Sequence, residues 1–325
     1  MNKLKILCVC LFVFSNLLAQ NQSITLEEIW SGEFSQEGLQ SLQSLNDGQS
    51  YIVQDYNRAK GEMRVDIFNY KTGDKTGELI NSGKIEGLNF FQTFSLSEDE
   101  QKAILGIQIE RIYRRSARGQ YFVYDIADNA LTQIDKDKIQ EPHFSPDNSK
   151  VAFVKDNNLH FKKLNDNSTT QVTTDGEKNK IINGITDWVY EEEFAFVKAF
   201  EWSPDGQYIA YLKFDESDVP EFSMDVYGTY GNDLYPSQDV FKYPKAGEKN
   251  AEVSLWLYDV DNQKSTEINL GDYYYIPRLK WSQANNLLSV QTTNRHQNEL
   301  KLHFVNTDDF SVQTILTETD KAYVD

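Results

Sequence analysis

Cysteine is nearly absent from this chain of 325 residues, and both copies, Cys8 and Cys10, lie at its extreme N-terminus. No disulfide bond and no thiolate metal site is therefore possible in the remainder of the chain. The four histidines are scattered, and none has the spacing to another histidine that a metal site requires. We expect this chain to hold no metal and no cofactor.

Recognisable catalytic motifs are also missing. The sequence contains no Gly-x-Ser-x-Gly nucleophile motif and no glycine-rich loop that could hold a phosphate. Positive charge is scarce, because 32 Lys and Arg stand against 50 Asp and Glu, for a net charge of −18. This balance argues against nucleic acid or an anionic membrane surface as a partner.

The first residues, 1–19, have the pattern of a secretory signal. Lys3 and Lys5 precede an apolar run from Ile6 to Phe14, and small and polar residues follow near Ala19. The run is too short to span a bilayer comfortably, although a retained anchor is the alternative. We expect an exported protein without membrane insertion, in the periplasm or at the cell surface of a Gram-negative bacterium. Its mature part would have a net charge of −18 − 2 = −20, because two lysines are removed.

Short alternating runs of apolar and polar residues dominate the rest of the chain. After a capping box at Thr25 and Glu28, which predicts a short helix, helical periodicity is scarce. The runs are bounded by Asp, Asn, Gly or Ser, which is typical of strands and turns. Examples are "GQYFVYDI", "KVAFVKD", "YIAYLKF" and "SLWLYDV".

A weak repeat of Ser-Pro-Asp-Gly character links these runs. Its aspartates, Asp47, Asp99, Asp147 and Asp205, are spaced by 52, 48 and 58 residues, and Ala284 holds the matching place 79 residues further on. A period near 50 residues with four strands in each unit favours a β-propeller. A β-sandwich is the alternative, but it would show turns without this longer recurrence. The long gap before the last copy, residues 217–253, is interpreted as an excursion from a blade edge.

Three consecutive glutamates, Glu191 to Glu193, interrupt this pattern within "ITDWVYEEEFAF". Asp187 could cap a short helix here, with Trp188, Val189 and Phe194 burying one side and the carboxylates turned outward. A solvated acidic turn is one interpretation. The other is a cation site, because neighbouring carboxylates raise each other's pKa unless a cation neutralises them. A peptide's N-terminal ammonium, with a pKa of roughly 7.7–8.0, is such a cation.

The motif also resembles a known family. "NGITDWVYEEEF", "WSPDGQYIAYLKFDESDVPEF" and "YPKAG" are similar to the N-terminal propeller of dipeptidyl peptidase IV, and "YIPRLKW" and "TNRHQN" to its bacterial members. These enzymes are serine exopeptidases of the prolyl oligopeptidase group. The resemblance runs from "ITLEEIW" to the end of the chain.

The resemblance implies roles for individual residues. Glu192 and Glu193 match the pair that binds the substrate's N-terminal amine, whereas Glu191 matches a glutamate without an assigned contact. Arg114 matches the arginine that contacts the substrate's backbone carbonyl and steadies the glutamates. The neighbouring Arg115 is the alternative for that role.

The resemblance also implies an organisation. The family fold is an eight-bladed propeller stacked on an α/β-hydrolase domain that carries the Ser, Asp and His of the triad. Residues 41–325 would form roughly the first five blades, and residues 20–40 would pack with the missing hydrolase domain. The implied activity is removal of N-terminal dipeptides, Xaa-Pro or Xaa-Ala, by a protein that is a homodimer at full length. This chain would lack catalytic residues. The alternatives are a prolyl tripeptidyl peptidase and a propeller that binds partners without catalysis.

Overall fold

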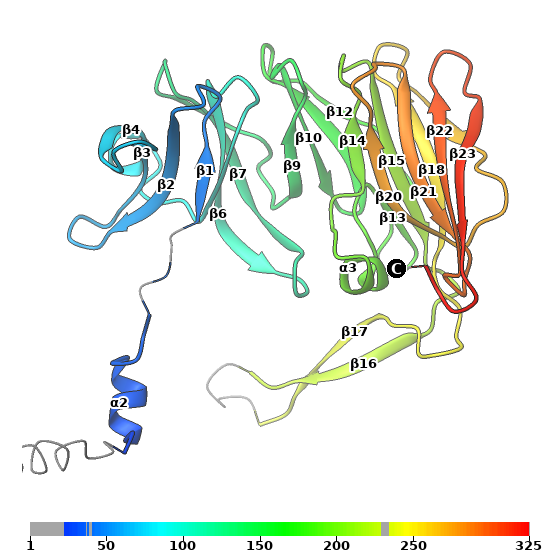
Figure 1. Cartoon of the computed structure of the whole chain (residues 1–325), viewed down its shortest axis with the longest axis horizontal. Coiled ribbons are helices and arrows are strands. Elements are labelled where there is room, and N and C mark those ends of the chain that lie inside the picture. Colours follow the sequence, from blue (N-terminus) through cyan, green and yellow to red (C-terminus); the bar gives the residue numbers. More distant parts are fainter. Residues whose placement is uncertain (1–22, 37, 39–40, 229–233, 325) are drawn as a thin grey trace, which may run out of the picture. The chain divides into compact units, whose positions relative to one another are not determined.

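The structure is a computed structural model that describes residues 23–36, 38, 41–228 and 234–324 (Figure 1). The predicted signal segment, 1–19, lies outside the described residues. The chain divides into two compact units, Met1–Leu42 and Gln43–Asp325. Among the described residues, no helix combines the length and the apolar character needed to cross a membrane.

The first unit contains the predicted short helix, α2, at Leu26–Ser31. Its capping box is confirmed: the Thr25 hydroxyl accepts from the backbone N–H of Glu28 at 3.2 Å, and the Glu28 carboxylate accepts from that of Thr25 at 2.8 Å. Gly32 ends the helix in the left-handed conformation. None of its residues is buried, and the large apolar side chains of residues 23–36 are exposed.

The second unit contains five consecutive antiparallel sheets of four or five strands and one two-stranded hairpin, which confirms the predicted all-β propeller architecture. Each of the five larger sheets is one blade, and the blades follow one another along the chain (Figure 1). A short 3₁₀ helix, η2 (Ser82–Lys84), follows the first blade. The first blade contains β1 (Leu42–Ser44), β2 (Ser50–Asn57), β3 (Glu62–Asn69) and β4 (Lys75–Asn81), and the second contains β5 (Thr93–Leu96), β6 (Lys102–Arg111), β7 (Ala117–Asp125) and β8 (Ala130–Gln133). The third contains β9 (Gln140–Phe144), β10 (Lys150–Lys155), β11 (Asn158–Lys163) and β12 (Thr169–Gln171), and the fourth contains β13 (Ile181–Asn183), β14 (Phe200–Trp202), β15 (Tyr208–Asp215), β18 (Glu252–Asp259) and β19 (Lys264–Ile268). The fifth contains β20 (Tyr275–Trp281), β21 (Leu287–Thr293), β22 (Glu299–Asn306) and β23 (Val312–Thr319).

Neighbouring blades bury the two faces of each central strand. In β6, Ala103 and Leu105 join a cluster with the first blade, whereas Ile104 joins a cluster with the third blade. Successive side chains of a strand point to opposite faces of its sheet, so a strand between two blades must be apolar on both sides. This explains why the second strands read as continuous apolar runs.

The repeated turn has one hydrogen-bonded form in three blades. In the third blade, the buried Ser145 hydroxyl donates to Asp147 at 2.5 Å and accepts from the backbone N–H of Lys150 at 2.9 Å. Ser97 and Ser203 make the equivalent pair of bonds in the second and fourth blades. The repeat found in the sequence is therefore a structural unit that joins the first strand of a blade to the second.

The fourth blade has its edge strand split in two. Both β13 and β14 pair with β15, and the chain between them leaves the sheet as an inserted segment, 184–199. Gly184 and Ala199 close its base, because the N–H of Ala199 donates to the carbonyl of Gly184 at 2.9 Å. Gly184 has a φ of +78°, and a Cβ there would lie 3.2 Å from Leu159 and from Val154, so the close turn requires glycine. This segment carries helix α3, Trp188–Glu193.

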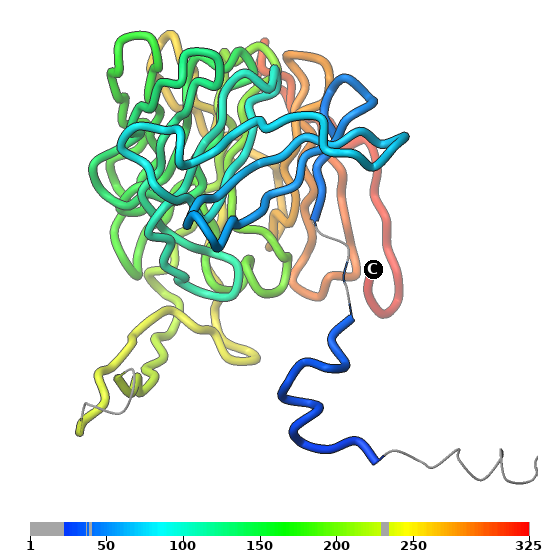
Figure 2. The backbone as a smooth tube through the Cα atoms, turned by 90° about the vertical axis from the view of Figure 1, so that its left-hand side faces the viewer, coloured from blue at the N-terminus to red at the C-terminus, as the bar shows by residue number. Residues whose placement is uncertain are grey.

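The predicted excursion forms the hairpin of β16 (Glu221–Val226) and β17 (Ser237–Lys242). It connects β15 to β18, two paired central strands, and so does not leave from a blade edge as the sequence suggested. Figure 2 shows the hairpin projecting away from the blades. Near its base, the ring of Tyr243 lies 4.3 Å from that of Trp188 on α3.

Candidate functional site

Helix α3 buries a different face from the one expected from its sequence. The prediction that Asp187 caps the helix is confirmed, since its carboxylate accepts from the backbone N–H of Tyr190 at 2.9 Å. Asp187, Tyr190 and Glu191 are buried, and Phe194 lies on the same face. These positions, i, i+3, i+4 and i+7, form one stripe of an α-helix. The expectation that all three glutamates point outward is therefore wrong for Glu191, and helical periodicity is the signal that could have shown it.

Glu191 ties the helix to the second blade. Glu191 is only 1% exposed. Its Oε1 atom accepts hydrogen bonds from the backbone N–H groups of Arg115 at 2.5 Å and Ser116 at 2.8 Å. Both groups lie in the loop between β6 and β7. Charge-assisted hydrogen bonds of this kind are about twice as strong as neutral ones. Glu191 thus fixes the loop that carries Arg114 against the helix that carries the other two glutamates.

Glu192 lies on the open face of α3 and meets Arg114. The Nε atom of Arg114 is 3.0 Å from Oε2 of Glu192, and the two side chains are 73% and 17% exposed. Glu193 is exposed, and among the described residues its side chain makes no hydrogen bond or ion pair. The structure therefore brings Glu192 and Arg114 together from two blades, and Glu193 follows Glu192 in the sequence. Of the two arginines considered, Arg114 makes this ion pair, whereas Arg115 contributes its backbone to Glu191.

Strand β20 also holds helix α3 in place, through contacts that the sequence did not indicate. The hydroxyl of the buried Tyr190 accepts from the backbone N–H of Ile276 on β20 at 2.9 Å. Arg278, also on β20, donates to the carbonyl of Phe194 at the end of α3, at 2.9 Å. The fifth blade thus holds both the middle and the end of the helix. No local sequence pattern links positions so far apart in the chain.

The open face of α3 carries two carboxylates, those of Glu192 and Glu193, and that of Glu192 is already paired with the Arg114 guanidinium. Such a set can accept several hydrogen bonds from an ammonium group, while Arg114 retains donors for a carbonyl oxygen. In the described part of the chain, no group of three His, Cys, Asp or Glu side chains could hold a metal ion. Two carboxylates beside one guanidinium give this face a net negative charge.

Two further carboxyl groups are buried, that of Asp187 at the start of helix α3 and that of Glu216. Burial raises the pKa of Asp187 to about 6, against the hydrogen bond from Tyr190. Burial, followed by the nearby Asp187, raises the pKa of Glu216 to about 7, while Lys242 opposes the shift. Their ordinary values are 3.8 and 4.5, so both groups bind a proton more tightly in the folded protein than in the unfolded chain.

This difference predicts that the contribution of Asp187 and Glu216 to the stability of the fold decreases as pH rises. The contribution is fully present below about pH 4 and is lost as pH rises to about 7, because the unfolded chain releases these protons at a lower pH than the folded protein does. We expect Glu216→Gln to raise the free energy of unfolding at pH 8 by on the order of 3 kcal/mol and to leave it nearly unchanged at pH 4. Urea unfolding of both proteins at the two pH values measures this. An equal effect at both pH values would contradict a titrating Glu216.

Comparison with known proteins bears on these observations. Residues 97–325 match the family described as the dipeptidyl peptidase IV N-terminal region. The chain is 31% identical over 317 residues to a probable dipeptidyl-aminopeptidase B of Aspergillus niger, covering 89% of this chain and 35% of that protein. It is 32% identical over 241 residues to human prolyl endopeptidase FAP, covering 73% and 30%.

A solved structure agrees in fold as well. Dipeptidyl peptidase 4 of Porphyromonas gingivalis superposes with a TM-score of 0.85 and 36% identity, over 94% of this chain and 43% of that one. The chain spans about a third of the length of the curated relatives. The family match covers well over half of the chain and includes the third, fourth and fifth blades and most of the second. The chain therefore belongs to the dipeptidyl peptidase IV family, as part of its N-terminal region.

Proposed function

We propose that this chain is the substrate-recognition part of a serine exopeptidase that removes dipeptides, Xaa-Pro or Xaa-Ala, from the free N-terminus of peptides. Glu192 and Glu193 would bind the N-terminal ammonium, and Arg114 would donate to a backbone carbonyl of the peptide. One observation carries the proposal: the 3.0 Å ion pair between Arg114 and Glu192, which joins two blades beside an exposed Glu193. The names of the A. niger and P. gingivalis relatives support the same activity.

The proposed site determines which peptide bond is cleaved. Anchoring the ammonium at a fixed place sets how far along the peptide a nucleophile can reach, so the bond after the second residue is the one presented. Binding that is remote from the reacting atoms then contributes to catalysis by orienting the scissile bond. The nucleophile, the oxyanion hole and the pocket for proline would belong to an α/β-hydrolase domain outside this chain.

Residues 20–40 would pack with that domain. The support is the exposed apolar character of the first unit, where Trp30 is 85% exposed. Burying such side chains against another domain would remove them from water. The other exposed large apolar residues here are Ile24, Leu26, Ile29 and Phe34.

We further propose that the full-length protein is an exported homodimer. The hairpin β16–β17 supports the dimer, because a projecting two-stranded ribbon with exposed Phe222, Met224 and Val226 offers apolar surface to a second copy. The pattern of residues 1–19 supports export to the periplasm or the cell surface.

Activity of the protein in its natural length tests the proposal. We expect cleavage of an Ala-Pro chromogenic substrate with a free amine, and none of the N-acetylated form. We also expect the rate to fall above about pH 8, where the substrate's amine loses its proton. Equal cleavage of the acetylated form would refute the amine site. Preference for Ala-Ala-Pro would indicate tripeptide release. A gene without a downstream Gly-x-Ser-x-Gly motif and later Asp and His would exclude catalysis.

A further inference from the structure

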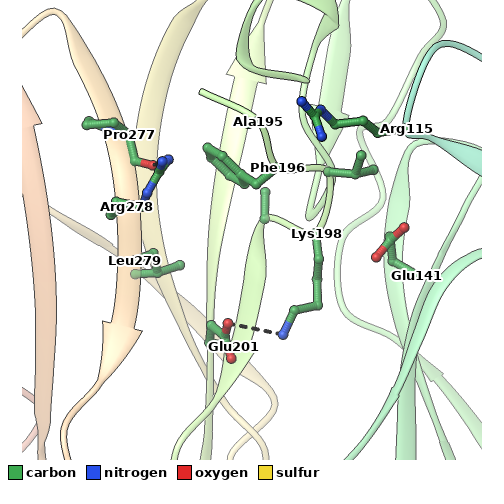
Figure 3. Close-up of a pocket in the computed structure, with 11 residues that line it drawn as sticks. Arg115, Glu141, Ala195, Phe196, Lys198, Glu201, Pro277, Arg278 and Leu279 are labelled. Carbon is green, nitrogen blue, oxygen red and sulfur yellow. Dashed lines mark hydrogen bonds and ion pairs between the residues drawn. The ribbon is translucent and has the colours of Figure 1, made fainter. Parts of the chain in front are cut away.

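A charged pocket of about 440 Å³ is lined by residues that neighbour those of the proposed amine site in the sequence. Figure 3 shows it between the inserted segment of the fourth blade, strand β20 of the fifth blade and the loop that precedes β7. Its charged lining comprises three cations and two acids: Arg115, Lys198, Arg278, Glu141 and Glu201.

The two arginines of this pocket have no acidic partner. Among the described residues, neither Arg115 nor Arg278 lies within ion-pair distance of a carboxylate. Their guanidinium groups point inward from opposite walls, toward Phe196 (Figure 3). Arg278 donates to the carbonyls of Phe194 and Pro277 at 2.9 and 2.6 Å, and its guanidinium carbon lies 5.7 Å from the centre of the Phe196 ring. It is therefore held in place while its charge stays uncompensated.

Of the two acids of the pocket, Glu201 is paired with lysines, whereas Glu141 makes no ion pair among the described residues. Glu201 pairs with Lys198 at 3.1 Å and with Lys280 at 3.6 Å. Glu141 lies on the wall near Lys198, and burial raises its pKa, although Lys198 opposes the shift. In a chain of net charge −18, two uncompensated guanidinium groups facing one cavity form a local site for an anion.

The pocket is built from the same two segments as the proposed amine site. Arg114 meets Glu192, whereas the next residue, Arg115, lines the pocket. On the other side, α3 ends at Glu193, and Ala195 and Phe196, which follow it, form the pocket wall. A peptide held by its ammonium at Glu192 and Glu193 would thus have this cavity beside its first residue.

We propose that the pocket binds the carboxylate of an acidic side chain, Asp or Glu, on the first residue of the peptide, through Arg115 and Arg278. This inference rests on the proposed function, because the peptide must first be anchored by its amine. It makes the protein selective for Glu-Pro and Asp-Pro N-termini over their amides, Gln-Pro and Asn-Pro. A guanidinium fork matches a carboxylate and cannot form the same charged pair with an amide.

Calorimetric binding of four probes to the recombinant chain tests the inference. The probes are Glu-Pro-amide and Gln-Pro-amide, each with a free and with an acetylated N-terminus, so that no C-terminal carboxylate is present. We expect the free Glu peptide to bind roughly tenfold tighter than the free Gln peptide, as for a charge-assisted pair. Arg115→Gln should reduce this preference to about twofold or less. This variant keeps the backbone bond to Glu191, and Arg278→Gln, checked by thermal unfolding, is a second probe of the same pocket.

The matched control is Arg118→Gln, which removes a guanidinium from the following strand, where it pairs with Glu110 at 3.1 Å. It should keep the full preference for glutamate. Equal affinity for the free Glu and Gln peptides, including no measurable binding of either, would overturn the inference. A preference that persists in both Arg115→Gln and Arg278→Gln would overturn it too. Failure of the proposed function has a different signature, because the acetylated peptides would then bind as tightly as the free ones.

Discussion

Replacing Glu192 with glutamine is expected to weaken the binding of a free-amine dipeptide by roughly thirtyfold or more. Removing one charge from a hydrogen-bonded pair with little exposure to solvent costs about 2–5 kcal/mol, and each 1.4 kcal/mol is a factor of ten. Glu192 is 17% exposed on its side chain, so solvent screens its interactions only in part. The substitution also leaves the Arg114 guanidinium without its acid, which increases the loss.

Calorimetry with Ala-Pro-amide measures this effect, and the same substitution in a longer natural protein should reduce activity in proportion. A suitable control is Glu177→Gln, an exposed glutamate that pairs with Lys180 at 2.6 Å and lies outside the site. It should bind the peptide as the unaltered chain does. Glu193→Gln should behave like Glu192→Gln. Losses in Glu192→Gln and Glu193→Gln as small as that in the Glu177→Gln control would refute the proposed amine site.

The second large effect is expected at Glu191, and it concerns stability. Glu191→Ala removes the acceptor of two backbone N–H groups, those of Arg115 and Ser116, near a buried position. Each buried donor left without a partner costs about 1–3 kcal/mol, so we expect the free energy of unfolding to fall by about 2–4 kcal/mol. Because the loop carries Arg114, amine binding should weaken as well. Glu191 is in this sense a positioning residue.

Glu191→Gln separates the two contributions of this side chain, since its amide oxygen can still accept both hydrogen bonds. We expect it to lose less than half as much stability as Glu191→Ala in urea unfolding, and to retain amine binding. An alanine variant as stable as the unaltered chain would show that the loop does not depend on this contact. Equal destabilisation by alanine and glutamine would assign the effect to the charge and not to the acceptor.

The sequence alone predicted the blades because their determinants are local. The apolar runs of β10 and β15 and the Ser-x-Asp turn are set by residues within a few positions of one another. The cap at Asp187 was predictable for the same reason. The turn repeat even gives the number of blades, since each copy builds one strand-to-strand connection.

The inner arrangement of the site was not predictable in this way. Glu191 faces inward because a loop 75 residues earlier in the chain presents two backbone donors to it, and no local pattern reports that loop. The origin of the excursion from two central strands depends on the pairing of β15 with β18 across a long insertion.

The sequence by itself determined that this is an acidic propeller chain with a glutamate-bearing helix inserted among its strands, because periodicity and turn chemistry act over short separations. Only the tertiary structure decided which loop binds Glu191, which arginine meets Glu192 and which two guanidinium groups share a cavity. These contacts join the second, fourth and fifth blades, and their geometry follows from how the blades pack against one another.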